Sequence, residues 1–184
     1  MLPSANGDYP LHDLVMRMVE DDINGETWRL RPLVDKNARK GINNVIKDVG
    51  RTDLIAGAGE LYLLVDRDRV AEHLGLVPTA PDDDVVTKLA QRSDAPHKLH
   101  TYFLRPNLEG LLRDIGRCDP SILPANLEAA LRKKLNDRDL VLNEVKKAAR
   151  ADVRNCMRQA QPGLDALVKA IASRLGAELT ASQA

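Results

Sequence analysis

Aromatic side chains are scarce in this chain of 184 residues, where phenylalanine, tryptophan and tyrosine together make up 3%. Strands are normally enriched in aromatic residues, so their scarcity beside many leucines, valines and alanines favours helices over a β-sandwich. Hydrophobic residues still account for 43% of the chain, which is enough to bury a core. The length suits one domain, or one domain with a helical extension.

Cysteine is rarer still, with two residues, and the sequence has no long apolar run. Cys118 and Cys156 fit no metal-binding spacing, and residues 1–13 lack the basic and apolar regions of a secretory signal. We therefore predict that both cysteines are reduced and buried in a cytoplasmic protein. No apolar run approaches the roughly 20 residues that cross a bilayer, so we expect no membrane association.

The chain also lacks an excess of charge of either sign, with 27 basic and 27 acidic residues. Proteins that coat nucleic acid through bulk electrostatics need a dense basic face, because their affinity comes from the release of counterions. A net charge of zero argues against that class. It leaves open a local basic cleft beside a cluster of acids.

Segments with helical spacing of apolar residues alternate with short strand-like segments. Strands that alternate with helices imply parallel crossover connections. The sequence therefore predicts an α/β fold with a small, mostly parallel sheet of three to four strands flanked by helices. We assign residues 1–118 to this domain and residues 119–184 to an all-helical extension packed on it. Within 35–49 a basic loop is predicted to lead into a helix with Ile42, Val45, Ile46 and Val49, and after Asp68 a short helix is predicted through Val70, Ala71 and Leu74 to Gly75. The other predicted helices are 9–22, 85–90 capped by Asp82 to Asp84, one opening at Asn107, 124–135, 137–160 and 162–176, and the predicted strands are 27–33, 61–65 and 97–104.

The acidic turn after Leu61–Val65 is the strongest candidate for a functional site. Ligands of open α/β sheets gather beyond the carboxyl ends of the strands, where Asp66 and Asp68 follow a continuous apolar run. Such a pair offers hard oxygen ligands, which suit Mg²⁺ or Mn²⁺ and, through the metal, phosphate oxygens. In the alternative interpretation, Asp66 caps the next helix and Asp68 is a solvated surface residue.

A second strand end carries Arg105 and, at the start of a helix, Glu109. If the two strands are neighbours, Glu109 supplies a third carboxylate, and Arg105 contacts a phosphate or pairs with an acid. In the alternative interpretation, Asn107 caps the helix and the helix dipole favours Glu109 in its first turn. A separate basic cluster is a candidate for binding phosphate, or else a solvated face, and it consists of Lys36, Arg39 and Lys40.

The acidic segments resemble motifs of the Toprim-like domain family. Leu61–Asp68 is similar to the strand of these domains that ends in Asp-x-Asp, and Tyr102–Leu112 resembles their strand-to-helix segment with a glutamate. Gln161–Leu175 is similar to the helical tails of Toprim-like proteins from bacterial defence systems and mobile elements. The resemblance extends from about Trp28 to Leu175.

This resemblance implies a metal-dependent nuclease. Asp66 and Asp68 would bind Mg²⁺ or Mn²⁺ and, with Glu109 as an auxiliary acid, catalyse the cleavage of DNA or RNA. Toprim domains begin with a strand that ends in a glutamate, and this chain opens instead with a helix. Val19–Asp21 resembles that motif locally, but Glu20 falls within a helical apolar stripe.

Two other functions remain open from the sequence. One is a non-catalytic partner or scaffold subunit of a defence or mobile-element complex, since the neutral charge and the long helical tail suit binding to a protein partner or a second copy. The other is a small-nucleotide binder or hydrolase that uses the same acids. The stripe that would face a partner helix consists of Leu140, Val141, Val145 and Ala148.

Overall fold

A parallel pair of strands lies at the centre of the computed structural model, which describes residues 9–23, 46–47, 49–50, 59–121 and 150–181. Strand β1 (Leu61–Asp66) pairs with β2 (Leu99–Leu104) over their whole length, from Leu61 opposite Leu99 to Asp66 opposite Leu104. The parallel pairing confirms the α/β class. Among the described residues the sheet has these two strands, and the strand predicted at 27–33 lies outside them.

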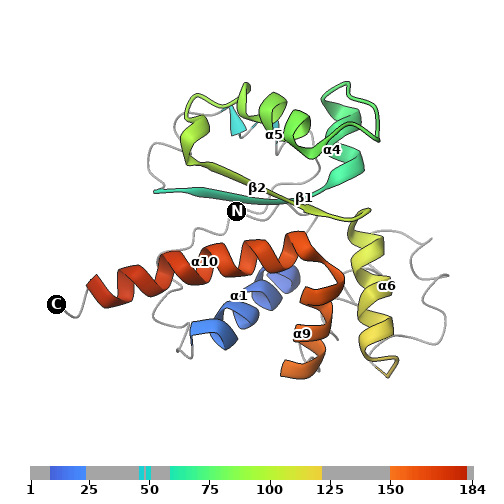
Figure 1. Cartoon of the computed structure of the whole chain (residues 1–184), viewed down its shortest axis with the longest axis vertical. Coiled ribbons are helices and arrows are strands. Elements are labelled where there is room, and N and C mark those ends of the chain that lie inside the picture. Colours follow the sequence, from blue (N-terminus) through green and yellow to red (C-terminus); the bar gives the residue numbers. More distant parts are fainter. Residues whose placement is uncertain (1–8, 24–45, 48, 51–58, 122–149, 182–184) are drawn as a thin grey trace.

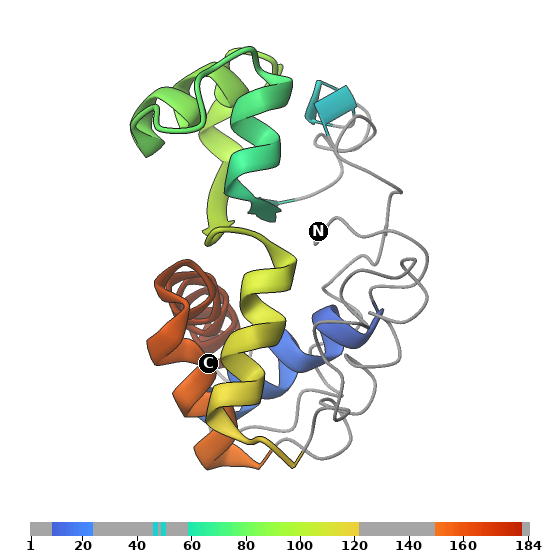
Figure 2. The same ribbon diagram turned by 90° about the vertical axis from the view of Figure 1, so that its right-hand side faces the viewer.

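Helices cover both faces of the strand pair (Figure 1; Figure 2). The crossover from β1 to β2 runs through α4 (Arg67–His73), α5 (Asp82–Ala90) and the short 3-10 helix η3 (Pro96–Lys98) on one face. The opposite face carries α1 (Tyr9–Ile23), α6 (Leu108–Cys118), α9 (Ala151–Ala160) and α10 (Pro162–Ala181). The sheet is therefore the middle layer of three.

The side chains of β1 alternate between two hydrophobic cores. Leu63 and Val65 pack with α4 and α5, whereas Leu64 joins the larger core with α1, α6, α9 and α10. A strand that is covered on both faces has no solvent side, so a continuous apolar run is what its sequence requires. The interpretation of 61–65 as a strand covered on both faces is confirmed, whereas its predicted central position is not, because β2 is its one neighbour among the described residues.

The start of α10 is fastened to the end of β2. A Cβ atom on Gly163 would lie 2.1 Å from the carbonyl oxygen of Phe103, so only glycine allows this approach. Next to it, the buried side chain of Gln161 accepts a hydrogen bond from the Arg105 amide (3.1 Å) and donates to the Arg105 carbonyl (2.8 Å). The side-chain amide nitrogen of Gln161 also donates to Oδ2 of Asp114 at 2.6 Å. These contacts fix the backbone at Arg105, just beyond the strand.

Most predicted helices occur where the sequence places them, and three details differ. Asp82, Asp83 and Asp84 lie inside the first turn of α5 rather than capping it, with Pro81 at the N-cap. The helix predicted at 137–160 cannot be continuous, because Arg150 has an extended backbone and α9 begins at Ala151. Helix α10 continues past Gly176 to Ala181, and the helix predicted at 124–135 lies outside the described residues.

The prediction of two reduced cysteines is wrong. Cys118 at the end of α6 and Cys156 in α9 form a disulfide, with their Cα atoms 5.8 Å apart. The sequence did not reveal this pairing because 38 positions separate the two residues, and only the packing of α6 beside α9 brings them together. Disulfides are uncommon in cytosolic proteins, so the bond does not support the cytoplasmic prediction.

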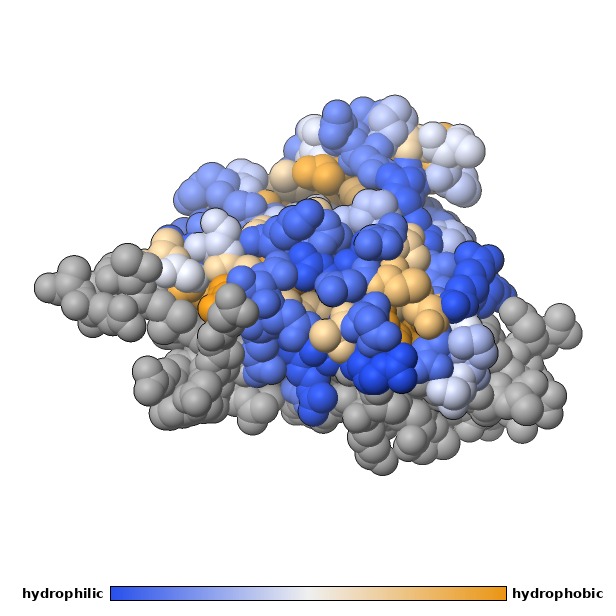
Figure 3. Space-filling view, turned by 60° about the horizontal axis from the view of Figure 1, so that its bottom comes forward, coloured by the Kyte–Doolittle hydropathy of each residue, from blue (hydrophilic) through white to orange (hydrophobic). Residues whose placement is uncertain are grey.

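The outer face of the helical layer is largely polar. Where Figure 3 shows described residues of this face, hydrophilic side chains dominate, and apolar ones form small separate patches. Across the described part of the chain, Val77 is the one large hydrophobic residue that is exposed. None of the described helices is both long enough and apolar enough to cross a bilayer. The partner stripe predicted at 140–148 lies outside the described residues.

Candidate acidic site at the carboxyl edge of the sheet

Asp66 is the last residue of β1 and its side chain points toward the start of α6. It occupies the N-cap position of α4 but makes no capping hydrogen bond there. Instead its Oδ1 accepts a hydrogen bond from the backbone amide of Leu108 at 2.8 Å. The capping interpretation of Asp66 is therefore wrong, because the neighbouring strand end offers its carboxylate a different donor.

Asp68, in the first turn of α4, makes a second contact between the same two turns. Its Oδ2 lies 3.4 Å from Nδ2 of Asn107, a long hydrogen bond, and its Oδ1 accepts the Arg69 amide at 2.8 Å. Asn107 also caps α6, since its side-chain oxygen accepts the Gly110 amide at 3.1 Å. Asp68 is thus half-buried between two elements and is not simply a solvated surface residue.

The carboxylates at this edge act on one another electrostatically. Burial is the largest cause that raises the pKa of Asp66, to about 6, and the negative charges of Glu109 and Asp68 add to it. The hydrogen bond from the Leu108 amide opposes this shift, as does the charge of Arg69, without cancelling it. Asp66 is therefore a half-buried acid in an environment that disfavours its negative charge. A cation placed beside it would remove that penalty.

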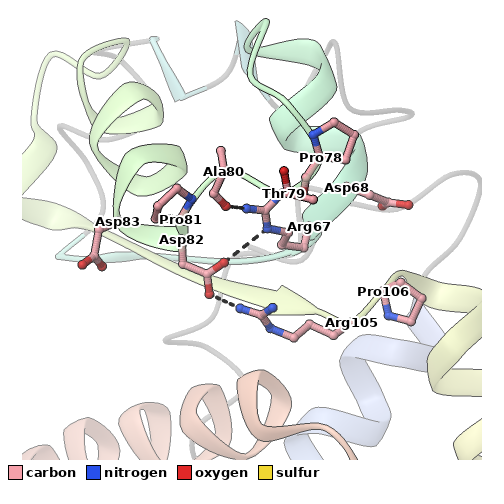
Figure 4. Close-up of a pocket in the computed structure, with 10 residues that line it drawn as sticks. All are labelled: Arg67, Asp68, Pro78, Thr79, Ala80, Pro81, Asp82, Asp83, Arg105 and Pro106. Atoms are coloured by element: carbon pink, nitrogen blue, oxygen red, sulfur yellow. Dashed lines mark hydrogen bonds and ion pairs between the residues drawn. The ribbon is translucent and has the colours of Figure 1, made fainter.

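A cavity of about 740 Å³ opens beside Asp68 (Figure 4). Its walls are Arg67, Asp68, the connection from Pro78 to Asp83, and the Arg105–Pro106 pair, whose peptide bond is cis. Asp66 and Glu109 are not among the residues that line it. The acidic turn therefore touches this cavity through Asp68, at the cavity's border.

Asp82 holds two arginines at the cavity. Its carboxylate accepts from Nε of the buried Arg67 at 3.2 Å and, through its other oxygen, from the guanidinium of Arg105 (Figure 4). Arg67 is further fixed by hydrogen bonds to the carbonyl oxygens of Pro78 (2.5 Å) and Ala80. Among the described residues the Arg105 side chain pairs with Asp82 alone, and it is 56% exposed. Of the two, Arg105 is the guanidinium that is accessible to a ligand.

The donor set fits a magnesium-like ion better than a transition metal. Among the residues that the structure describes, no group of three or more histidine, cysteine, aspartate or glutamate side chains could hold a metal. A zinc site normally requires three or four such ligands. Mg²⁺ commonly uses one or two carboxylates and completes its shell with waters and substrate phosphates. Asp66 and Asp68 can meet that smaller requirement.

The structure brings most of the predicted site residues to one edge of the sheet. Asp66, Asp68, Arg105 and Glu109 all follow the carboxyl ends of the paired strands, whereas Lys36, Arg39 and Lys40 lie outside the described residues. Sequence reasoning missed Arg67 and the bridging role of Asp82. Arg67 is buried and lies between the two aspartates of the motif. Its position directly after an apolar strand was the one sequence feature that could have indicated a role at the site.

Comparison with known proteins gives no further identification. No protein-family model, no curated protein and no solved structure matches this chain.

Proposed function

We propose that this protein is a metal-dependent phosphodiester-cleaving enzyme of the Toprim-like kind, with Mg²⁺ or Mn²⁺ bound by Asp66 and Asp68. The observation that carries the proposal is the direct contact between the two strand ends. The Asp66 carboxylate binds the Leu108 amide at 2.8 Å, and Asp68 meets Asn107 at 3.4 Å. Acids from one strand end and Glu109 from the other therefore share one edge, next to an accessible arginine.

Each residue has a defined part in this chemistry. Asp66 and Asp68 hold the metal, which when bound polarises a phosphoryl oxygen and activates water. Arg105 leaves Asp82 to contact a non-bridging phosphate oxygen, for which a guanidinium is well shaped. Glu109 is in the first turn of α6, close enough for its charge to act on Asp66, and serves as an auxiliary acid.

A cleavage assay tests this function directly. The full chain is incubated with labelled single- and double-stranded DNA and RNA in Mg²⁺, in Mn²⁺ and in chelator. We expect metal-dependent cleavage that falls at least a hundredfold in Asp66→Asn and Asp68→Asn, as is usual when a metal ligand or a key electrostatic group is lost, on the order of 10²–10³. Arg105→Gln should retain metal binding and lose substrate affinity.

The matched control is Asp152→Asn, which removes an exposed acid at the start of α9, outside the site. It should cleave like the wild type. If wild-type protein cleaves no polynucleotide, or if Asp66→Asn and Asp152→Asn are equally active, the proposal is wrong.

The volume of the cavity favours a second candidate, a small-nucleotide binder or hydrolase. A cavity of about 740 Å³ lies within the range of roughly 300–1,000 Å³ that is typical of small-ligand sites. Nucleoside mono-, di- and triphosphates added to the same assay separate the two functions. Turnover of nucleotides without cleavage of polynucleotides would select this candidate.

A further inference from the structure

A second cavity, of about 570 Å³, lies at the opposite end of α4 from the acidic turn. Among described residues it is lined by Ile46, Lys47, Gly50, His73 and Arg92. Three of these five carry basic side chains, and all three are exposed to solvent. No acidic residue is among those lining residues, in contrast to the first cavity, where aspartates outnumber arginines.

Close backbone packing brings two of these cations together. A Cβ atom on Gly50 would lie 2.9 Å from the carbonyl oxygen of Arg92, so the glycine lets this turn approach the end of the α5 connection. The Gly50 amide donates to the Lys47 carbonyl at 3.2 Å and closes the turn, and Lys47 and Arg92 both line the cavity. Figure 2 shows the described residues of this segment beside α4. The third basic residue, His73, is the last residue of α4.

The basic side chains of this cavity differ from three well-fixed arginines of the described chain. Arg67, Arg105 and Arg158 each donate to an aspartate. For Lys47, His73 and Arg92, no side-chain hydrogen bond or ion pair occurs with any described residue. Two cationic groups gathered at one cavity repel each other, and an anion between them reverses the sign of that interaction.

We propose that this cavity binds a phosphoryl group through Lys47, Arg92 and His73. A phosphoryl group presents several charged oxygens, so it can accept from a lysine, a guanidinium and an imidazole N–H together. Helix α4 has seven residues, with Asp66 just before its start and His73 at its end. At a rise of 1.5 Å per residue the two sites are about 10 Å apart along the helix. The phosphoryl site is therefore separate from the acidic turn and independent of the proposed metal chemistry.

Thermal unfolding of the full chain in the presence of pyrophosphate tests this site. Chelator is included so that metal cannot bind the acidic turn, and ionic strength is held constant with potassium chloride. We expect a saturable rise in Tm. The pyrophosphate concentration that gives half of this rise should increase about five- to tenfold in Lys47→Gln and in Arg92→Gln, as expected for losing one charge contact near a surface.

Two controls keep the result specific. Lys88→Gln removes a cation from the last turn of α5, outside both cavities, and should respond like the wild type. Arg105→Gln, at the first cavity, should also respond like the wild type, and loss of its response would place the anion at the first cavity and overturn the proposal. Anions excluded from protein surfaces stabilise every variant equally, so equal responses in all variants, or no rise in the wild type, would also overturn it.

Competition with a short single-stranded oligonucleotide identifies the source of the phosphoryl group. Displacement of pyrophosphate by the oligonucleotide assigns the site to a polynucleotide backbone. Failure of the oligonucleotide to compete, with pyrophosphate still bound, assigns the site to a small phosphate.

Discussion

Aspartates at the base of the helical layer and aspartates at the edge of the sheet are treated in opposite ways by this fold. Asp21 and Asp22 lie in the last turn of α1, where the helix dipole disfavours acids, and each accepts hydrogen bonds from two guanidinium nitrogens of an arginine on α9. Arg154 reaches Asp21 at 2.7 Å and Arg158 reaches Asp22 at 2.6 Å. At the sheet edge, Asp66 lies near two further carboxylates and accepts one backbone amide.

The direction of the pKa shift expresses the same difference. Burial opposes ionisation of Asp165, but hydrogen bonds from Lys169 and Arg158, each 2.7 Å, outweigh burial and lower its pKa. Burial also opposes ionisation of Asp66, and there the neighbouring acids reinforce it, so its pKa rises to about 6. Acids with matched cations stabilise the helical layer. An acid without a matched cation stabilises the fold only when a cation from solution binds to it.

Removing the central cation of the helical layer should have the largest effect on stability. Arg158 is buried and its guanidinium binds Asp22 and Asp165 together, so Arg158→Ala leaves two partly buried acids without that partner. Breaking a buried pair costs roughly 3–5 kcal/mol of the free energy of unfolding, and a loss near the lower end is expected because both acids are partly exposed. Urea denaturation at pH 7 measures the loss.

The matched control is Arg150→Ala, which breaks a pair of similar geometry with Asp152 on the exposed surface. Exposed pairs are screened by solvent, so little change is expected. A similar loss in both variants would remove the distinction between buried and surface pairs on which the comparison depends.

Neutralising Asp66 should raise the free energy of unfolding, whereas removing Arg158 lowers it. Its pKa is about 6 in the folded protein and 3.8 as a free group, so the unfolded chain loses this proton first as pH rises. Folded-state stability therefore falls between about pH 4 and pH 6, and the loss amounts to at most about 3 kcal/mol above that range. Asp66→Asn keeps an oxygen for the Leu108 amide and should be more stable than the wild type at pH 8 in chelator, with no gain near pH 3.

Asp165→Asn is the counterpart of this change in the helical layer. The pKa of Asp165 is lowered by folding, so its charge stabilises the native state above its unfolded pKa and the asparagine variant should be less stable at pH 8. The comparison fails if denaturation curves show both asparagine variants shifted in the same direction at that pH.

The sequence predicted the local architecture of the site better than its contacts. Apolar runs and turn residues were enough to place the β1 strand, the α6 N-cap at Asn107 and the acids beyond each strand. The bond from the Leu108 amide to Asp66 spans 42 positions, and it depends on the register in which β1 and β2 pair. A pattern within either segment contains no information on that register.

Other contacts could not be predicted for the same reason. From the sequence, Asp82 is predicted to be an acid at the start of a helix. Only the path of the connection after α4 brings it between Arg67 and Arg105. The Cys118–Cys156 bond likewise depends on helix packing between distant segments. The helical nature of Glu20, by contrast, follows from local apolar spacing, and α1 confirms it.

Binding of Mg²⁺ to the purified chain is the most direct test of the central claim, that the sheet edge is an acidic site completed by a cation. Stability is measured by urea denaturation at pH 7.5 in chelator and again in Mg²⁺ at about ten times its Kd. A stabilisation of about 1.4 kcal/mol is expected for the wild type and for Asp152→Asn, and none for Asp66→Asn or Asp68→Asn. No stabilisation of the wild type, or equal stabilisation of all four proteins, would contradict the account.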